Sequence, residues 1–327
     1  MADPENVPWQ SPAGPATATP ARVPGSIRRT SSVDIQWPGE IGATLVLSGF
    51  GRDLRTAADG TIEVLATAAT RVTIEAGDVS ELITEPAVVT TGLLGVPARS
   101  LRRHLDREHP GLTTDGSLLG LLLDEVPVAS LISGAARRLL PKPPGGQGFT
   151  RQHPPIDVCS GWKADGIKVR AINAGQGMIG RLGSAAPALV SHDPLAWHHT
   201  ATLSKPGEMR RRRRLDLHVE GDTVHVEGMF RDTLIEADGV DTVVHEYALT
   251  ALVDLRTLTV TSVTPEGRAL PGLDCPAATA SAQRIVGLPL ADVRRIVRDQ
   301  FEGPTTCTHL NDELRAFGDL HSLIALL

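Results

Sequence analysis

The feature that most constrains the fold of this 327-residue chain is an internal repeat. The segment Gly95–Leu122 aligns without a gap with the segment Gly287–Leu314, at a constant offset of 192 positions. Upstream, LVLSGFGRDL aligns with VHVEGMFRDT at a slightly shorter offset. Two such copies are expected to form the same supersecondary unit. The positions of the first segment that are identical in the second are Gly95, Pro97, Arg102, Arg103, Gly111, Thr113, Thr114, Leu118 and Leu122.

Both halves of the chain show the same order of secondary-structure patterns. Short runs that alternate apolar and polar residues over 31–86, and again over 213–267, predict antiparallel strands. Helical patterns follow, from near Ala98 in the first half and from near Ala291 and Thr308 in the second. We therefore expect an α+β fold of two tandem pseudo-repeats, each an antiparallel β-meander followed by helices.

Composition divides the chain into four parts. Residues 1–26 are rich in proline and alanine, and we expect them to form a disordered tail that is dispensable for folding. Residues 27–140 are assigned to the first repeat. Prolines and glycines cluster in LPKPPGGQG, so residues 141–209 are assigned to a linker and connector. Residues 210–327 form the second repeat, which carries the candidate site.

The charge and the aromatic content argue against a nucleic-acid partner. The net charge is -6 and aromatic residues make up 3%, which leaves few groups for phosphate binding or base stacking. The basic run Arg210–Arg214 is short, and we expect a solvated strand entry or an anion-facing edge. The most apolar run, LLGLLLDEVPVASLI, is interrupted by Asp124, Glu125 and Pro127, so no membrane span is predicted.

Cysteine use and the N-terminal sequence favour a soluble, cytoplasmic protein. The cysteines are odd in number and form no CxxC pair, which excludes a disulfide framework and a zinc ribbon. The N-terminus lacks a basic start followed by an apolar stretch, so no secretory signal is predicted. Neither a GxGxxG motif beside a βαβ pattern nor a GxxxxGK[ST] loop occurs, so no cofactor is predicted.

The repeat separates scaffold from candidate chemistry, because both copies need their scaffold residues. In the alignment Cys307 lies opposite Asp115, and His309 lies opposite Ser117. Asp and Ser are typical of helix starts, where unpaired N–H groups lower the pKa of a thiol. A neighbouring imidazole exchanges protons near neutral pH. We therefore predict a reactive Cys307 that depends on His309, although an ordinary helix start remains the alternative.

A second cluster, His245-Glu246-Tyr247, also occurs only in the second half. Side chains alternate between the two faces of a strand, so His245 and Tyr247 share one face and Glu246 points the other way. The predicted catalytic set is Cys307, His309, His245, Tyr247 and Glu246. An ordinary half-buried strand holds the same residue types, and that alternative stays open.

A metal site is chemically permissible but is not predicted. Zinc binds mixtures of thiolate and imidazole tetrahedrally. Cys275, Cys307 and His309, together with His245 or His218, contain such a mixture, but no spacing in the sequence requires a metal.

Sequence blocks along the chain resemble one bacterial family. RRTSSVDIQWP, DPLAWH, RRRRLDLHV, MFRD, VVHEYALTA, the Cys-Pro at 275–276 and CTHLNDELR occur in this order. Together they resemble the family called domain of unknown function 2889, over nearly the whole chain after the tail. The resemblance implies a bacterial protein of uncharacterised role and supplies no reaction.

The candidate residues favour an enzyme that acts on a small organic substrate by Cys/His acid–base or nucleophilic chemistry, of lyase, isomerase or hydrolase type. The alternative is a non-catalytic ligand-binding or assembly module. Proximity discriminates between them, since the enzyme interpretation requires His245 and the Cys307–His309 turn to lie together. A small organic ligand is the expected partner, and the sequence sets no oligomeric state.

Overall fold

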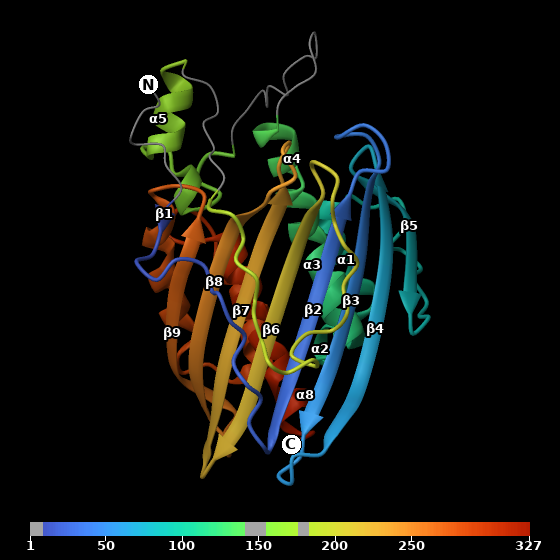
Figure 1. The fold of residues 1–327 in the computed structure, drawn as a ribbon, viewed down its shortest axis with the longest axis vertical. Coiled ribbons are helices and arrows are strands. Elements are labelled where there is room, and N and C mark those ends of the chain that lie inside the picture. Colours follow the sequence, from blue (N-terminus) through green and yellow to red (C-terminus); the bar gives the residue numbers. More distant parts are fainter. Residues whose placement is uncertain (1–8, 141–154, 176–182) are drawn as a thin grey trace.

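The computed structural model describes residues 9–140, 155–175 and 183–327 (Figure 1). In these residues one antiparallel sheet has the strand order β1-β9-β8-β7-β6-β2-β3-β4-β5. The strands are β1 (Trp9–Gln10), β2 (Ser26–Gln36), β3 (Leu45–Thr56), β4 (Ile62–Glu75), β5 (Asp78–Glu85), β6 (Met209–Glu220), β7 (Thr223–Ile235), β8 (Asp241–Asp254) and β9 (Thr259–Leu270).

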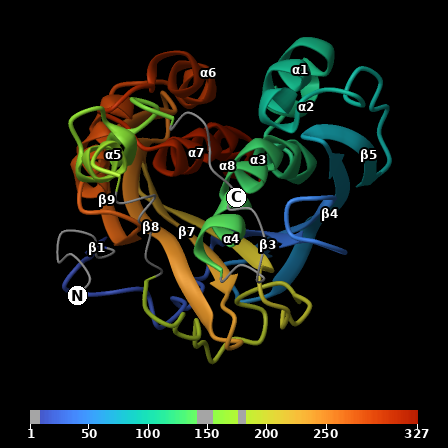
Figure 2. The same ribbon diagram turned by 90° about the horizontal axis from the view of Figure 1, so that it is seen from above.

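Helices cover one face of this sheet. Figure 2 shows α1–α3 and α6–α8 side by side on that face. Helices follow strands in each half, so the chain is of the mixed α+β class, as predicted. The helical segments are η2 (Ala98–Ser100), α1 (Leu101–Glu108), α2 (Pro110–Thr114), α3 (Leu118–Ile132), α4 (Gly134–Leu139), η3 (Ser160–Trp162), α5 (Ile167–Asn173), η4 (Cys275–Ile285), α6 (Leu290–Gln300), α7 (Thr308–Ala316), η5 (Phe317–Asp319) and α8 (Leu320–Ile324).

The two halves of the chain meet in the middle of the sheet. β2 opens the first meander, β6 opens the second, and these two strands pair antiparallel from Ser26–His218 to Ile35–Met209. One hydrophobic core lies between the first meander and α1–α3, and another lies between the second meander and α6–α8. The sheet is therefore continuous, although each half buries most of its apolar residues in its own core. The superposition of the halves as repeats stays a prediction.

Two glycines of the repeated motif allow helices to approach the sheet closely. A Cβ at Gly49 would lie 2.4 Å from the Thr70 Oγ1 and 3.3 Å from a methyl group of Leu122 on α3. A Cβ at Gly228 would lie 2.7 Å from the Glu313 Oε1 on α7. The Thr70 and Glu313 contacts are shorter than real Cβ contacts and the Leu122 contact is tighter than most, so a side chain at either glycine would require a neighbouring side chain to shift.

The expected disordered tail, residues 1–26, is ordered in part. Residues 1–8 lie outside the described residues, but β1 pairs with β9 at the edge of the sheet. The Ala16 N–H donates to Glu246 Oε1 at 2.7 Å, and Arg22 pairs with Asp193 at 2.7 Å. The expectation is therefore wrong for residues 9–26, because composition does not reveal hydrogen bonds to buried groups in distant parts of the chain.

The connector covers the face of the sheet that the helices leave open. Of the expected segment 141–209, residues 141–154 and 176–182 lie outside the described residues. The part after residue 183 crosses in front of β6 and β2 in Figure 1. The buried ring of His198 bonds to the hydroxyls of Ser32 and Thr30 on β2 at 2.8 and 2.9 Å. Both faces of the central strands are therefore covered.

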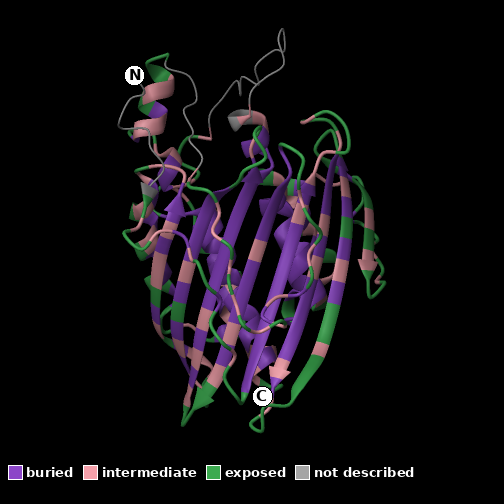
Figure 3. Ribbon diagram, viewed as in Figure 1, coloured by how far each residue is buried: buried purple, intermediate pink, exposed green. Residues whose placement is uncertain are grey.

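The basic run is buried, which corrects the expectation of a solvated strand entry. It lies on β6, in the middle of the sheet, where Figure 3 shows mostly buried residues. Arg211 and Arg213 face the helices and are 0% and 1% exposed. Arg210 faces the connector and pairs with Asp34 at 2.5 Å. A central strand has two covered faces, and alternation sends the arginines to both.

The apolar segment of the first half is a core helix. Among the described residues, Leu118–Arg137 is the one helical stretch long and apolar enough to cross a membrane. The share of its most apolar window that is buried inside the protein is 89%. Its hydrophobicity is therefore used in packing against the first meander.

Candidate active site

An arginine–aspartate pair occurs at the same place in both meanders. Arg29 on β2 lies opposite Asp53 on β3, and the side chains pair at 2.7 Å. Arg211 on β6 lies opposite Asp232 on β7, and these side chains pair at 2.9 Å. Because both halves contain this buried pair, it belongs to the scaffold.

The next strand of each meander differs between the halves. Asp53 lies opposite Ala66 on β4, whereas Asp232 lies opposite His245 on β8. A register shift follows each aspartate, between Asp53 and Leu54 and between Asp232 and Thr233. The sheet therefore places His245 where the first half has an alanine.

Helix α7 brings a second imidazole to His245. Cys307 is the N-cap residue of α7, and His309 lies in the first turn. The rings of His245 and His309 stack with their centroids 3.7 Å apart and their planes at 20°. On the other side, His245 Nδ1 lies 3.5 Å from Asp232 Oδ2. No layer of core separates the strand from the turn, as the enzyme interpretation requires.

Cys307 and Tyr247 complete this group. The Cys307 Sγ lies 3.9 Å from His309 Nδ1, and the backbone N–H groups of Leu310 and His309 face the sulfur. The Tyr247 hydroxyl lies between Cys307 and Thr279, buried and without a hydrogen bond of normal geometry. The group is called the histidine cluster below, and it consists of Asp232, His245, Tyr247, Cys307 and His309.

Burial shifts the pKa of three cluster side chains, His309, Tyr247 and Cys307, toward their uncharged forms. It lowers the pKa of His309 well below the ordinary value, and the charge of His245 lowers it further. It raises the pKa of Tyr247 far above 10, with a smaller contribution from Cys307. It also raises the pKa of Cys307, although the N–H of Leu310 opposes this effect. The lowered thiol pKa expected at the helix start is therefore wrong, because desolvation outweighs the helix N–H groups.

Glu246 lies outside the cluster. It points to the opposite face of β8, as its place in the strand predicts. There it is 0% exposed, accepts a hydrogen bond from Arg231 Nε at 2.6 Å and accepts the Ala16 N–H. The structure therefore gives this predicted catalytic residue a partner in the scaffold.

Asp232 belongs to the cluster although it was not among the predicted site residues. Its pairing with Arg211 repeats the Arg29–Asp53 pair of the first half, so Asp232 also serves the scaffold. The available signal was the strand pairing, because a residue near the end of β7 lies opposite the start of the strand that follows.

His218 was considered as a metal ligand in the sequence analysis. It instead stacks on His225 with ring centroids 5.1 Å apart, and both are partly exposed.

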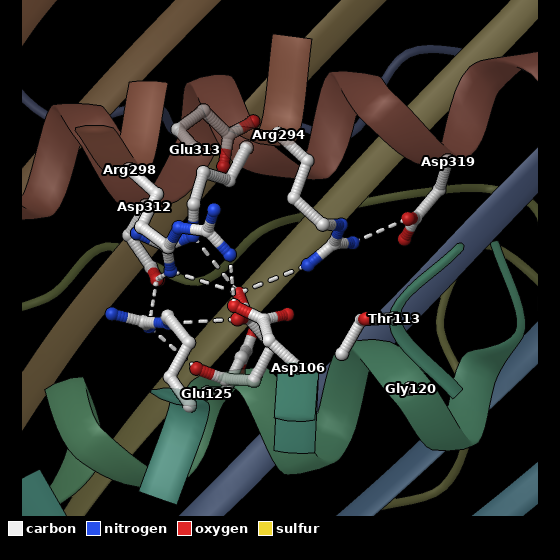
Figure 4. A network of polar contacts seen from close by, with 12 residues as sticks. Asp106, Thr113, Gly120, Glu125, Arg294, Arg298, Asp312, Glu313 and Asp319 are labelled. Carbon is white, nitrogen blue, oxygen red and sulfur yellow. Dashed lines mark hydrogen bonds and ion pairs between the residues drawn. The ribbon is translucent and has the colours of Figure 1, made fainter. Parts of the chain in front are cut away.

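A buried ion network lies beside the cluster, between the helices and the sheet. Figure 4 shows Glu125 on α3 facing Asp312 and Glu313 on α7. Asp312 Oδ2 accepts from Arg211 at 2.7 Å and from Arg213 at 2.9 Å. The network joins the two halves, since Arg213 also donates to Glu125 at 2.8 Å.

This network has more acids than bases. Among the described residues, the connected ion pairs include seven carboxyl groups and six guanidinium groups. The acids are Asp53, Asp124, Glu125, Asp232, Asp312, Glu313 and Asp319, and the bases are Arg29, Arg102, Arg211, Arg213, Arg294 and Arg315. With His245 and His309 neutral, one negative charge is left to be balanced by a proton or a cation.

An open cleft lies on the opposite face of the sheet. Its volume is about 460 Å³, and it lies between the N-terminal segment and strands β6–β9. His218, His225 and Thr250 are among its lining residues, and no residue of the histidine cluster lines it. The cleft and the cluster are therefore separate features on two faces of one sheet.

Residues 209–322 match the family described as Protein of unknown function (DUF2889). The resemblance was expected over nearly the whole chain after the tail, whereas the match begins at β6 and ends in α8. It contains every residue of the histidine cluster. No curated protein matches the chain.

Proposed function

We propose that this protein is an enzyme that transfers protons on a small organic substrate at the histidine cluster. The observation that carries the proposal is the stacking of His245 on His309, with ring centroids 3.7 Å apart. The first half has Ala66 at the place of His245 in the strand ladder, and the sequence alignment places Ser117 opposite His309. Folding of such a unit therefore does not require the two imidazoles.

The directions of the pKa shifts of His309, Tyr247 and Cys307 suit acid–base catalysis. A neutral imidazole has a lone pair that accepts a substrate proton, and Asp232 stabilises the imidazolium that forms. The Tyr247 hydroxyl and the Cys307 thiol keep their protons at neutral pH and donate to the substrate atom that gains charge. One proton moves from substrate to imidazole and one returns, as in isomerases, lyases and hydrolases.

Burial limits the substrate to a small molecule or to one small reacting group. His245 and His309 are each 9% exposed, and Tyr247 is 0% exposed. A group that reaches the imidazoles leaves water, and the electrostatic effect of the cluster then increases.

Deuterium exchange tests proton transfer even while the substrate is unidentified. Pools of small compounds with acidic C–H bonds, together with simple esters and lactones, are incubated with the full chain in D₂O. Proton NMR then follows the loss of each C–H signal and the appearance of hydrolysis products. We expect at least one compound to react, and we expect His309→Ala and His245→Ala each to reduce its rate at least about 100-fold.

The matched control is the double variant His218→Ala/His225→Ala, which removes the partly exposed histidine pair and leaves the cluster intact. It should react at the parent rate. A compound that raises the thermal midpoint of the protein but is neither exchanged nor hydrolysed would support the non-catalytic ligand-binding alternative. Equal rates in the parent and in His309→Ala would contradict catalysis at the cluster.

A further inference from the structure

We propose that Asp232, His245 and His309 bind one divalent transition-metal ion. One ligand atom from each residue lies within 4.8 Å of the other two, and all three residues are buried. Two imidazoles and one carboxylate form a donor set that divalent transition metals occupy with open positions for water or substrate. The inference deepens the proposed function, since it concerns the same cluster.

The orientation of His309 leaves one nitrogen for a metal. Its Nδ1 lies 3.4 Å from Thr308 Oγ1 and 3.9 Å from Cys307 Sγ. Its Nε2 is buried and has no hydrogen-bond partner. A metal-binding imidazole commonly donates its other N–H to a neighbouring acceptor, and the hydroxyl of Thr308 is placed to receive it.

The carboxylate is held by a second layer of contacts. Arg211 Nη1 donates to both oxygens of Asp232, at 2.9 and 3.0 Å. Each carboxylate oxygen has two lone pairs, so these bonds leave capacity for a metal. Arg211 is itself paired with Asp312 at 2.7 Å, which reduces its repulsion of a nearby cation.

The charge of the surrounding network also favours a cation. The ion pairs connected through Asp232 contain one more carboxyl group than guanidinium groups. A divalent ion that carries one hydroxide supplies the single positive charge that balances them. Without it, one carboxyl group of the network has to keep its proton. Buried charges that lack a partner are costly, so the occupied site is favoured.

Metal binding requires a small rearrangement of the rings. The two ring planes lie at 20° to each other, and each lone pair lies in the plane of its own ring. Donor atoms at about 2.0–2.1 Å from a tetrahedral ion lie about 3.3 Å apart. Rotation of each ring about its own side-chain bonds brings the lone pairs together. A bound water with a pKa near 7 then acts as the base of the proposed reaction in place of an imidazole.

The test measures metal binding directly and does not require a substrate. The full chain is treated with a chelator, dialysed and titrated with Zn²⁺ by calorimetry, and Co²⁺ is added separately to record its visible absorption. We expect one ion per chain and a Co²⁺ spectrum of low coordination number. His245→Ala, His309→Ala and Asp232→Asn should each weaken binding at least about 100-fold, with circular dichroism confirming the fold. Where one of these variants does not fold, binding to His309→Gln is measured in its place.

The double variant His218→Ala/His225→Ala separates this site from adventitious surface binding. Unchanged Zn²⁺ affinity in this variant supports the proposal. Loss of binding in this variant, or binding that persists in both His245→Ala and His309→Ala, would overturn it. Exchange activity that depends on His309 in chelator-treated protein without Zn²⁺ binding would overturn the metal site and leave the proposed function intact. Cluster-dependent Zn²⁺ binding without turnover of any compound would leave the metal site and remove the catalytic role.

Discussion

Replacing Asp312 by asparagine should destabilise the protein more than any surface charge substitution. Asp312 is 2% exposed and accepts hydrogen bonds from four arginines. Asparagine keeps the shape but removes the charge, so the guanidinium groups lose a shared counterion. Removing one partner of a buried ion pair typically costs about 3–5 kcal/mol. This is a large part of an ordinary stability of about 5–15 kcal/mol.

The assay is urea unfolding at pH 7, followed by tryptophan fluorescence. The matched control is Asp292→Asn, because Asp292 pairs with Arg295 on the surface of α6, where the side chains are 43% and 56% exposed. An exposed pair of this kind contributes about 0–1 kcal/mol. We expect a lower urea midpoint for Asp312→Asn, an unchanged slope, and a midpoint close to the parent for Asp292→Asn.

The pH dependence identifies the cause of this loss. Burial would raise the pKa of Asp312, but the charges of Arg211, Arg315 and Arg213 outweigh it and lower the pKa to about 2. The carboxylate therefore stabilises the fold above about pH 4, and this stability is lost as the pH falls through 2. The difference between parent and Asp312→Asn should shrink over that range. A loss below about 1 kcal/mol would refute the reasoning.

Three further predictions concern other buried groups. Tyr247→Phe removes a buried hydroxyl that lacks a hydrogen bond, so the urea midpoint should stay equal or rise, while the exchange activity of the proposed function should fall about 10-fold or more. Burial raises the pKa of Glu313 to about 6, so its proton stabilises the fold at low pH and this contribution is lost as the pH rises from about 4.5 to 6; Glu313→Gln should remove that part of the slope of stability against pH. Deletion of residues 1–25 removes the Ala16 contacts of Arg231 and Glu246 and should destabilise the fold by about 2 kcal/mol or more in urea unfolding, contrary to the expectation of a dispensable tail.

The sequence by itself determined the elements and the two halves. Alternation of apolar and polar residues predicted the meanders, and the helix starts near Ala98, Ala291 and Thr308 agree with η2, α6 and α7. These properties are local, because the periodicity of a strand or a helix depends only on residues that are close together in the sequence. Comparison of the halves also selected Cys307, His309, His245 and Tyr247, which the fold brings together.

Only the tertiary structure decided which charged residues lie inside. The sequence predicted that Arg211 and Arg213 lie on a solvated strand entry. The burial of their charges depends on partners such as Asp312, which lies about a hundred residues away in the chain. The burial of Glu246 likewise depends on its partner Arg231 on the neighbouring strand β7. The order of residues 9–26 likewise depends on their contacts with distant parts of the chain. The thiol of Cys307 gave the opposite error: the helix start was predicted correctly, but desolvation by the surrounding core outweighs the helix N–H groups and raises its pKa. Pairing and desolvation are set by the packing of distant segments, and neither leaves a local pattern in the sequence.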